Sequence, residues 1–150
     1  DLISGAGGQL SALISVELWS LVGSNSNRLA AGYIQEMVKT IRGLGGIAIT
    51  STQGMQDLFS LDNGKYGKGI LDSSRIKIVM QMEEQEARLI QNVLNLSEEE
   101  VRQITRFRRG EGLLCIGYNH VPIAFYATQK EYDAITTSPT DLLNRKDRKA

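Results

Sequence analysis

The clearest hydrophobic pattern in the chain follows Asn27, a residue type that caps helices. Apolar residues recur there at helical spacing, and glycines at 43–46 then supply the positive backbone angles that helix C-termini favour. The pattern predicts a helix from Asn27 to this glycine run, with a strand at 47–51 directly after it. The apolar positions of the predicted helix are Leu29, Tyr33, Ile34, Met37, Val38 and Ile41.

Shorter runs on either side of this helix predict less regular elements. Residues 10–16 are mostly apolar and β-branched toward their end, which favours a buried strand, although a run of this length also suits a helix. Residues 53–61 are typical of a short helix. Residues 62–69 are rich in glycine, and we expect them to form a flexible loop.

The second half of the chain repeats the order of strand and helix. Residues 76–82 predict a strand and 83–94 a helix. Ser97 and Glu100 then have the spacing of a capping box, which marks the start of a further helix.

A hairpin is predicted after these helices. Its strands are 112–118 and 121–128, and the two residues between them, Asn119 and His120, have the spacing of a tight turn. The charged tail from Pro139 onward is expected to be frayed and solvated.

The order of these elements predicts an α/β fold. Strands alternate with helices in the first half, which favours a mostly parallel sheet flanked by helices, and the C-terminal β-hairpin adds antiparallel strands. A chain of 150 residues fits one domain with a single core. Because such sheets bind ligands at the carboxyl ends of their strands, candidate chemistry is sought there.

Composition narrows the range of functions. Basic and acidic residues both number 17, so the global basic field that collects nucleic acid is missing and any DNA contact would be local. The chain has one cysteine and one histidine, so it cannot form an internal disulfide or pair metal ligands of these types. No metal site is therefore expected. The single cysteine fits a reducing, intracellular compartment. The apolar runs are far shorter than the ~20 residues that span a bilayer, so membrane association is expected only through partners.

Two polar residues at predicted strand ends suit nucleotide hydrolysis. Glu17 follows the first strand and Gln53 the second. A glutamate in this place can polarise the water that attacks a terminal phosphate, while a neighbouring amide senses that phosphate and bonds the same water. A carboxylate after an apolar run is also typical of a helix start or a solvated turn, and Gln53 also suits helix capping.

The glycines at 4–8 do not form a phosphate-binding loop. That loop requires Gly-Lys followed by Ser or Thr, whereas these glycines run into Gln9, Leu10 and Ser11. We interpret them as a turn.

Arginines next to glycine turns are candidates for a finger that reaches into a neighbouring subunit's site and stabilises charge in the transition state. Arg42, Arg108 and Arg109 rank first, although arginines at a helix end also complement the helix dipole. Trp19 is expected in the core, Cys115 is expected to be a small buried residue in a strand, and His120 is expected in the hairpin turn without a partner.

A set of segments in a fixed order covers most of the chain: 16–22, 27–36, 39–46, 50–57, 69–78, 96–100, 109–114 and 135–139. In this order they resemble the VirB-type conjugation ATPases of type IV secretion systems, particularly those of Gram-positive mobile elements. The resemblance implies a RecA-like P-loop NTPase fold that hydrolyses ATP with Mg²⁺, with Glu17 as the Walker B glutamate and Gln53 as the sensor glutamine.

The resemblance also implies partners and a location. The family assembles as a ring, typically a hexamer, at the cytoplasmic face of the cell membrane. There it works with the secretion channel and coupling proteins to move DNA or protein or to build a pilus.

Two departures from the family pattern bear on activity. Val16 stands where the family has the aspartate that holds the water shell of magnesium, so either this copy is impaired or a segment is missing near 11–16. The Walker A loop of the family lies upstream of the resembling segments. We therefore expect residues 1–150 to be the C-terminal part of one RecA-like ATPase domain, inactive without its phosphate loop.

Two other functions stay open at this point. The chain could be a non-catalytic docking module of the secretion machinery, or part of a DNA-translocating coupling protein of the related ring-motor clade. Binding of Mg-ATP and salt-dependent binding of DNA would separate these hypotheses.

Overall fold

A parallel pair of strands organises the first half of the molecule. The computed structural model describes residues 12–23 and 26–136 of the chain. β1 (Ala12–Ser15) and β2 (Ile47–Thr50) run parallel, in a register that pairs Ser15 with Thr50. The predicted strands at 10–16 and 47–51 are therefore confirmed over these residues. The glycine turn at 4–8 and the tail from Pro139 lie outside the described residues.

Short and long helices connect and cover this pair. The Asn27 side chain accepts a hydrogen bond from the Ala30 N–H at 2.7 Å, which confirms the predicted cap. The 3-10 turn that continues this helix ends at Gly45, whose φ of 74° lies in the left-handed region that glycine tolerates. The elements here are α1 (Trp19–Val22), α2 (Arg28–Thr40), η1 (Ile41–Leu44), α3 (Met55–Leu58), η2 (Leu61–Gly64) and α4 (Lys65–Ser73).

The predicted loop at 62–69 is wrong, because most of it is helical. Gly64 (φ 79°) begins α4, and Gly67 lies inside that helix against the carbonyl oxygen of Leu58, where a Cβ atom would collide. The glycines therefore allow a helix to approach the neighbouring backbone closely. Composition alone does not distinguish this use of glycine from a flexible loop.

The second half of the chain forms a three-stranded antiparallel sheet. β3 (Ile76–Met80) pairs with β4 (Glu111–Ile116), and β4 pairs with β5 (Asn119–Ala124). The hairpin is confirmed, but its turn lies at Gly117 and Tyr118, where Gly117 has a φ of 61°. His120, predicted in the turn, is therefore a residue of β5.

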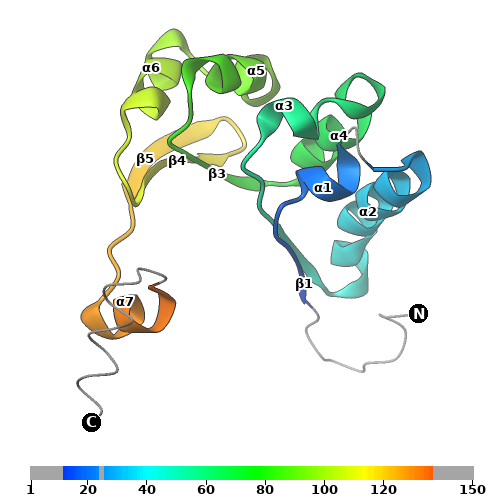
Figure 1. Cartoon of the computed structure of the whole chain (residues 1–150), viewed down its shortest axis with the longest axis horizontal. Coiled ribbons are helices and arrows are strands. Elements are labelled where there is room, and N and C mark those ends of the chain that lie inside the picture. The colour runs from blue at the N-terminus through cyan, green and yellow to red at the C-terminus, as the bar shows by residue number, and fades with distance from the viewer. Residues whose placement is uncertain (1–11, 24–25, 137–150) are drawn as a thin grey trace.

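Two amphipathic helices cover this antiparallel sheet. They are α5 (Glu84–Leu94) and α6 (Glu98–Arg106), and the capping box predicted from Ser97 and Glu100 begins α6. Their apolar sides pack with the inner face of the sheet, where Ile90, Ile104 and Leu113 are almost completely buried. α7 (Gln129–Ile135) follows β5 and lies apart from the other helices (Figure 1).

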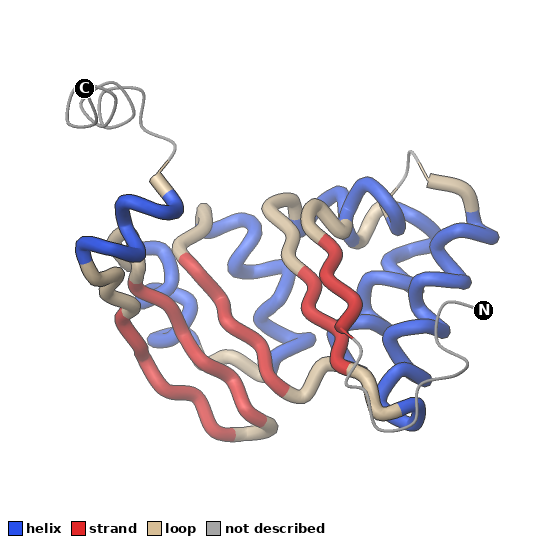
Figure 2. The backbone as a smooth tube through the Cα atoms, turned by 90° about the horizontal axis from the view of Figure 1, so that it is seen from below, coloured by secondary structure: helices blue, strands red, loops and turns tan. Residues whose placement is uncertain are grey.

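The two sheets lie side by side in one layer, with α1 to α6 on one face only (Figure 1 and Figure 2). Among the described strands, only β1 and β2 pair in parallel. β2 bonds to β1 along one edge and β3 bonds to β4 along one edge, and no described strand bonds to the other edge of either. The opposite face of the layer carries exposed apolar side chains, including Ile14 (66%), Ile49 (55%) and Ile76 (64%). Within the described residues, no helix is long and apolar enough to cross a membrane.

Candidate functional site at the carboxyl edge of the parallel strands

Glu17 and Gln53 emerge from the same edge of the parallel pair. Two backbone hydrogen bonds extend the pairing past the ends of β1 and β2: Ser51 N–H donates to the Ser15 carbonyl, and Leu18 N–H donates to the Ser51 carbonyl, both at 2.8 Å. The segment carrying Glu17 is thereby fastened to the segment that leads into Gln53. The sequence prediction that both residues follow strand ends agrees with this placement.

Glu17 is held in an unusual backbone conformation. Its φ of 58° lies in the left-handed region, which costs non-glycine residues free energy and is concentrated at functional sites. Its carboxylate Oε2 accepts a hydrogen bond of 2.6 Å from the indole N–H of Trp19, and its carbonyl accepts one of 2.8 Å from the Ser20 hydroxyl. Within the described part of the chain, Oε1 has no hydrogen-bond partner and is the oxygen left to bind a water.

The segment after β2 is exposed at Gln53 and anchored just beyond it. The Gln53 side chain has no hydrogen bond to another described residue, and the neighbouring Thr52 hydroxyl is buried without a described partner. Two residues later, the Met55 N–H donates to Oε1 of Glu86 on α5 at 3.2 Å. This bond places the carboxyl end of β2 close to the start of α5, which follows the carboxyl end of β3.

The edge that carries Glu17 and Gln53 offers a carboxylate and an amide, and no described cluster of side chains there suits a metal ion. Glu17 and Gln53 have the groups needed to orient an attacking water. Val16 is apolar and 67% exposed at the position beside Glu17, so it offers no side-chain oxygen to a magnesium ion or its waters. No group of three His, Cys, Asp or Glu side chains within the described residues could hold a metal, and the sequence contains no Gly-Lys-Ser or Gly-Lys-Thr.

The three candidate finger arginines lie at opposite ends of the strands. Arg42 is in η1, which precedes β2, so it lies toward the amino end of that strand. Arg108 and Arg109 are separated from β4 by Gly110, and Gly112 of β4 pairs with Met80 at the carboxyl end of β3. All three are exposed, and none forms an ion pair with another described residue.

The expectation that His120 has no partner is wrong, because it forms a partly buried polar pair between β5 and α6. Nδ1 of His120 lies 2.7 Å from Oε1 of Glu100, and the His120 side chain is only 8% exposed. The other carboxylate oxygen accepts bonds from the backbone N–H and the hydroxyl of Ser97. Burial raises the pKa of Glu100, but these hydrogen bonds from Ser97 and His120 outweigh it and hold the pKa below its ordinary value.

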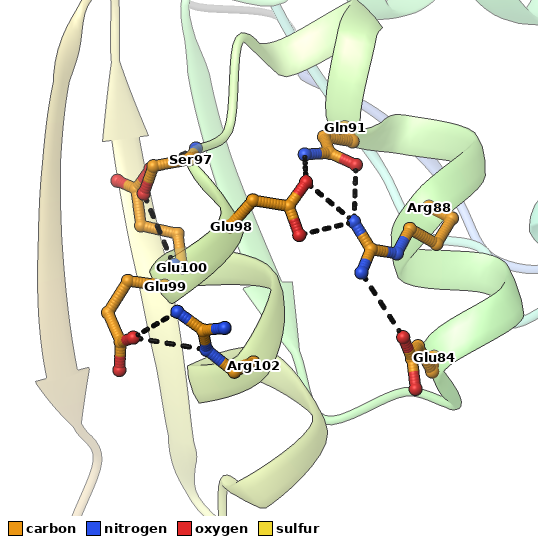
Figure 3. A network of polar contacts seen from close by, with 8 residues as sticks. All are labelled: Glu84, Arg88, Gln91, Ser97, Glu98, Glu99, Glu100 and Arg102. Carbon is orange, nitrogen blue, oxygen red and sulfur yellow. Dashed lines mark hydrogen bonds and ion pairs between the residues drawn. The ribbon is translucent and has the colours of Figure 1, made fainter.

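A second polar network joins α5 to α6 on the solvent side (Figure 3). Arg88 contacts Glu84 at 3.3 Å and Glu98 at 2.7 Å, and Gln91 donates a further bond to Glu98. Hydrogen bonds from Arg88 and Gln91 lower the pKa of Glu98. Because these side chains are exposed, the network orients the two helices and contributes little to stability.

Cys115 and Trp19, which the sequence predicted to be buried, both contribute to packing. Cys115 is 3% exposed in β4, as predicted, and burial raises the pKa of its thiol. Trp19 is partly buried against the core.

Comparisons with known proteins bear on the whole fold. A family model described as the TraG P-loop domain matches residues 7–143. The structure of VirB4 from Thermoanaerobacter pseudethanolicus superposes with a TM-score of 0.72 and 28% sequence identity, over 80% of this chain and 32% of that chain. This chain therefore spans about a third of the length of that VirB4, and the match confirms the predicted RecA-like α/β fold.

A more distant group of structures shares the fold alone. The genome packaging NTPase B204 of Sulfolobus turreted icosahedral virus 2, solved with ATP-gammaS, has a TM-score of 0.58 at 18% identity, over 77% of this chain and 52% of that chain. The same NTPase solved with AMP gives a TM-score of 0.55 at 18% identity, over 78% and 52% of the two chains. A search of curated proteins found no match.

Proposed function

Since this chain belongs to the TraG P-loop domain family, we propose that it supplies the Glu17 and Gln53 side of an ATP-hydrolysing motor in a type IV secretion system. The supporting observation is that both residues leave the same edge of a parallel strand pair, fastened together by the bonds between Ser15, Leu18 and Ser51. In α/β sheets this edge is where ligands bind. The motor energises conjugative transfer of DNA or protein, or pilus assembly.

The two side chains have different tasks in this proposal. The Trp19 N–H holds one carboxylate oxygen of Glu17, so the other oxygen can accept a hydrogen bond from the attacking water and increase its nucleophilicity. Gln53, exposed on the neighbouring strand end, bonds the same water and the terminal phosphate. ATP and Mg²⁺ are held by a phosphate loop that the sequence of this chain does not contain, so the chain alone does not hydrolyse ATP.

Assembly and location complete the proposal. The motor forms a ring of identical subunits, for which a hexamer is the expected size. An arginine of one subunit, Arg42, Arg108 or Arg109, reaches the site of the adjacent subunit. It acts in the cytoplasm at the inner face of the cell membrane, through contacts with the secretion channel and its coupling proteins.

Turnover measurements on a longer protein that joins this chain to a phosphate loop test the proposal. Glu17→Gln keeps the shape of the side chain but removes its charge, so ATP turnover should fall by about 10²- to 10⁴-fold while nucleotide binding is retained. Glu36→Gln, on the exposed side of α2, is the matched control and should leave turnover unchanged. Turnover retained in Glu17→Gln would contradict the assignment.

A docking module without catalysis is the second candidate. The observation that favours it is the apolar Val16 beside Glu17, where a magnesium site requires oxygen. Calorimetry on the longer protein decides between the two, because a docking module should bind no Mg-ATP.

A further inference from the structure

Glu86 on α5 fastens the segment that follows β2. Its carboxylate oxygen Oε1 accepts a hydrogen bond of 3.2 Å from the N–H of Met55, 31 residues earlier in the chain. Met55 is the first residue of α3, and Gly54 before it has no side chain that could cap this helix. An N–H group at a helix start needs an acceptor from outside its own helix, and Glu86 provides one from α5.

Gln53 therefore lies in a short segment that is held at both ends. At the front, hydrogen bonds to the N–H and the carbonyl of Ser51, each of 2.8 Å, continue the strand pairing. At the back, Glu86 holds Met55. Only residues 52–54 lie between these two anchors. Because the Gln53 side chain has no hydrogen bond to another described residue, the anchors fix the place from which its amide extends.

Glu86 projects from a helix that is itself firmly held. Ala87 and Ile90 of α5 are almost completely buried in the core. On the solvent side, Arg88 pairs with Glu98 of α6 at 2.7 Å (Figure 3). A side chain on such a supported helix can hold a neighbouring loop in place, because site residues are positioned most closely by rigid elements.

We propose that Glu86 is a positioning residue for Gln53. It touches neither the nucleotide nor the attacking water, and it acts on ATP turnover through the place that it gives to the Gln53 amide. This inference rests on the proposed function, in which Gln53 bonds the attacking water and the terminal phosphate. A displacement of ~1 Å is enough to weaken such bonds strongly in the transition state. Loss of the Glu86 carboxylate should therefore slow the chemical step and spare nucleotide binding.

Steady-state kinetics of the longer protein that joins this chain to a phosphate loop test the proposal. Glu86→Ala should lower kcat by about tenfold and change the KM for ATP by less than about twofold. Glu86→Gln keeps an oxygen that can accept the bond from Met55, so it should retain at least about half of the wild-type kcat. Glu83→Gln is the matched control and should leave both constants unchanged, because the Glu83 side chain is exposed directly before α5 and has no hydrogen bond or ion pair with another described residue.

A double-mutant cycle separates this role from general damage to the fold. If Glu86 acts through Gln53, adding Glu86→Ala to Gln53→Ala should cost no further turnover. Losses that multiply would overturn the proposal, and so would an unchanged kcat in Glu86→Ala when Gln53→Ala is slow. Unchanged turnover in Gln53→Ala would instead overturn the assignment of Gln53 itself, and the positioning role with it.

Amide hydrogen exchange on the 150-residue chain tests the anchor without any ATP turnover. Glu86→Ala should speed exchange of the Met55 amide by about fivefold or more, because it removes the acceptor of that N–H. The Ser51 amide, which donates to the Ser15 carbonyl, should exchange at the wild-type rate. Equal acceleration at both amides, or unchanged exchange at Met55, would overturn the proposal. Glu86→Leu keeps more of the side-chain volume and replaces the alanine variant in each assay if that variant does not fold.

Discussion

His120 on β5 and Glu100 on α6 form a partly buried hydrogen bond, with 2.7 Å between Nδ1 and Oε1. The same carboxylate closes the capping box of α6 through Ser97. One side chain therefore fixes the start of a helix and attaches that helix to the hairpin. The Cys115 that pairs with His120 across the strands lies on the same buried face of the sheet.

The Glu100 side chain should contribute measurably to stability. Glu100→Ala removes the bond to His120 and the cap on the Ser97 N–H, so we expect the free energy of unfolding to fall by about 1–3 kcal/mol. Urea unfolding followed by circular dichroism measures the change. Glu99→Ala is the control, because the Glu99 side chain is 76% exposed and, among the described residues, pairs with Arg102 alone, so its effect should stay within about 0.5 kcal/mol.

The lowered pKa of Glu100 predicts a loss of stability in acid. A folded-state pKa below the unfolded value means that the stabilisation is fully present above the ordinary glutamate pKa, about 4.3, and is lost as pH falls through the folded-state value. The difference in unfolding free energy between wild type and Glu100→Gln should therefore shrink below about pH 4. Carbon-13 NMR titration gives a direct check, and a Glu100 midpoint at or above the ordinary value would contradict the assignment.

The Cys115 thiol should be unreactive in the folded chain. Burial raises its pKa, and the negative charge of Glu100 raises it further, so little thiolate is present at neutral pH. Ellman's reagent should therefore modify Cys115 slowly in buffer and rapidly in denaturant. Fast modification of the folded chain would show that β4 opens locally.

The elements that local chemistry specifies were predictable from the sequence. The Asn27 cap and the Ser97 capping box each rely on side chains close in sequence, and both are present in the structure. The strand ends that carry Glu17 and Gln53 were also predictable, because a parallel pair places both carboxyl ends at one edge.

Contacts between distant segments were not predictable in this way. The bond between His120 and Glu100 depends on the position of the hairpin turn. The turn lies at Gly117 and Tyr118 rather than at Asn119 and His120, so His120 is a residue of β5 and bonds to Glu100. The glycine-rich segment was assigned wrongly for the same reason, since the neighbour that requires Gly67 is Leu58.

A pair of glycine substitutions tests whether α4 packs as closely as the structure shows. Alanine normally stabilises a helix relative to glycine by about 0.5–1 kcal/mol. If α4 packed loosely, Gly67→Ala would therefore raise the free energy of unfolding. At Gly67 the added Cβ would collide with the Leu58 carbonyl, so we expect Gly67→Ala to lower the free energy of unfolding by about 1–3 kcal/mol instead.

Gly43→Ala provides the matched control for this collision. Gly43 lies in η1, and a Cβ atom there would meet nothing within 4 Å, so the substitution should be neutral or stabilise by up to about 1 kcal/mol. Urea unfolding of both variants gives the comparison. Because the two substitutions have the same effect on the unfolded chain, a difference in sign isolates the contact between α4 and Leu58. Equal stabilisation by both would show that α4 stands away from α3.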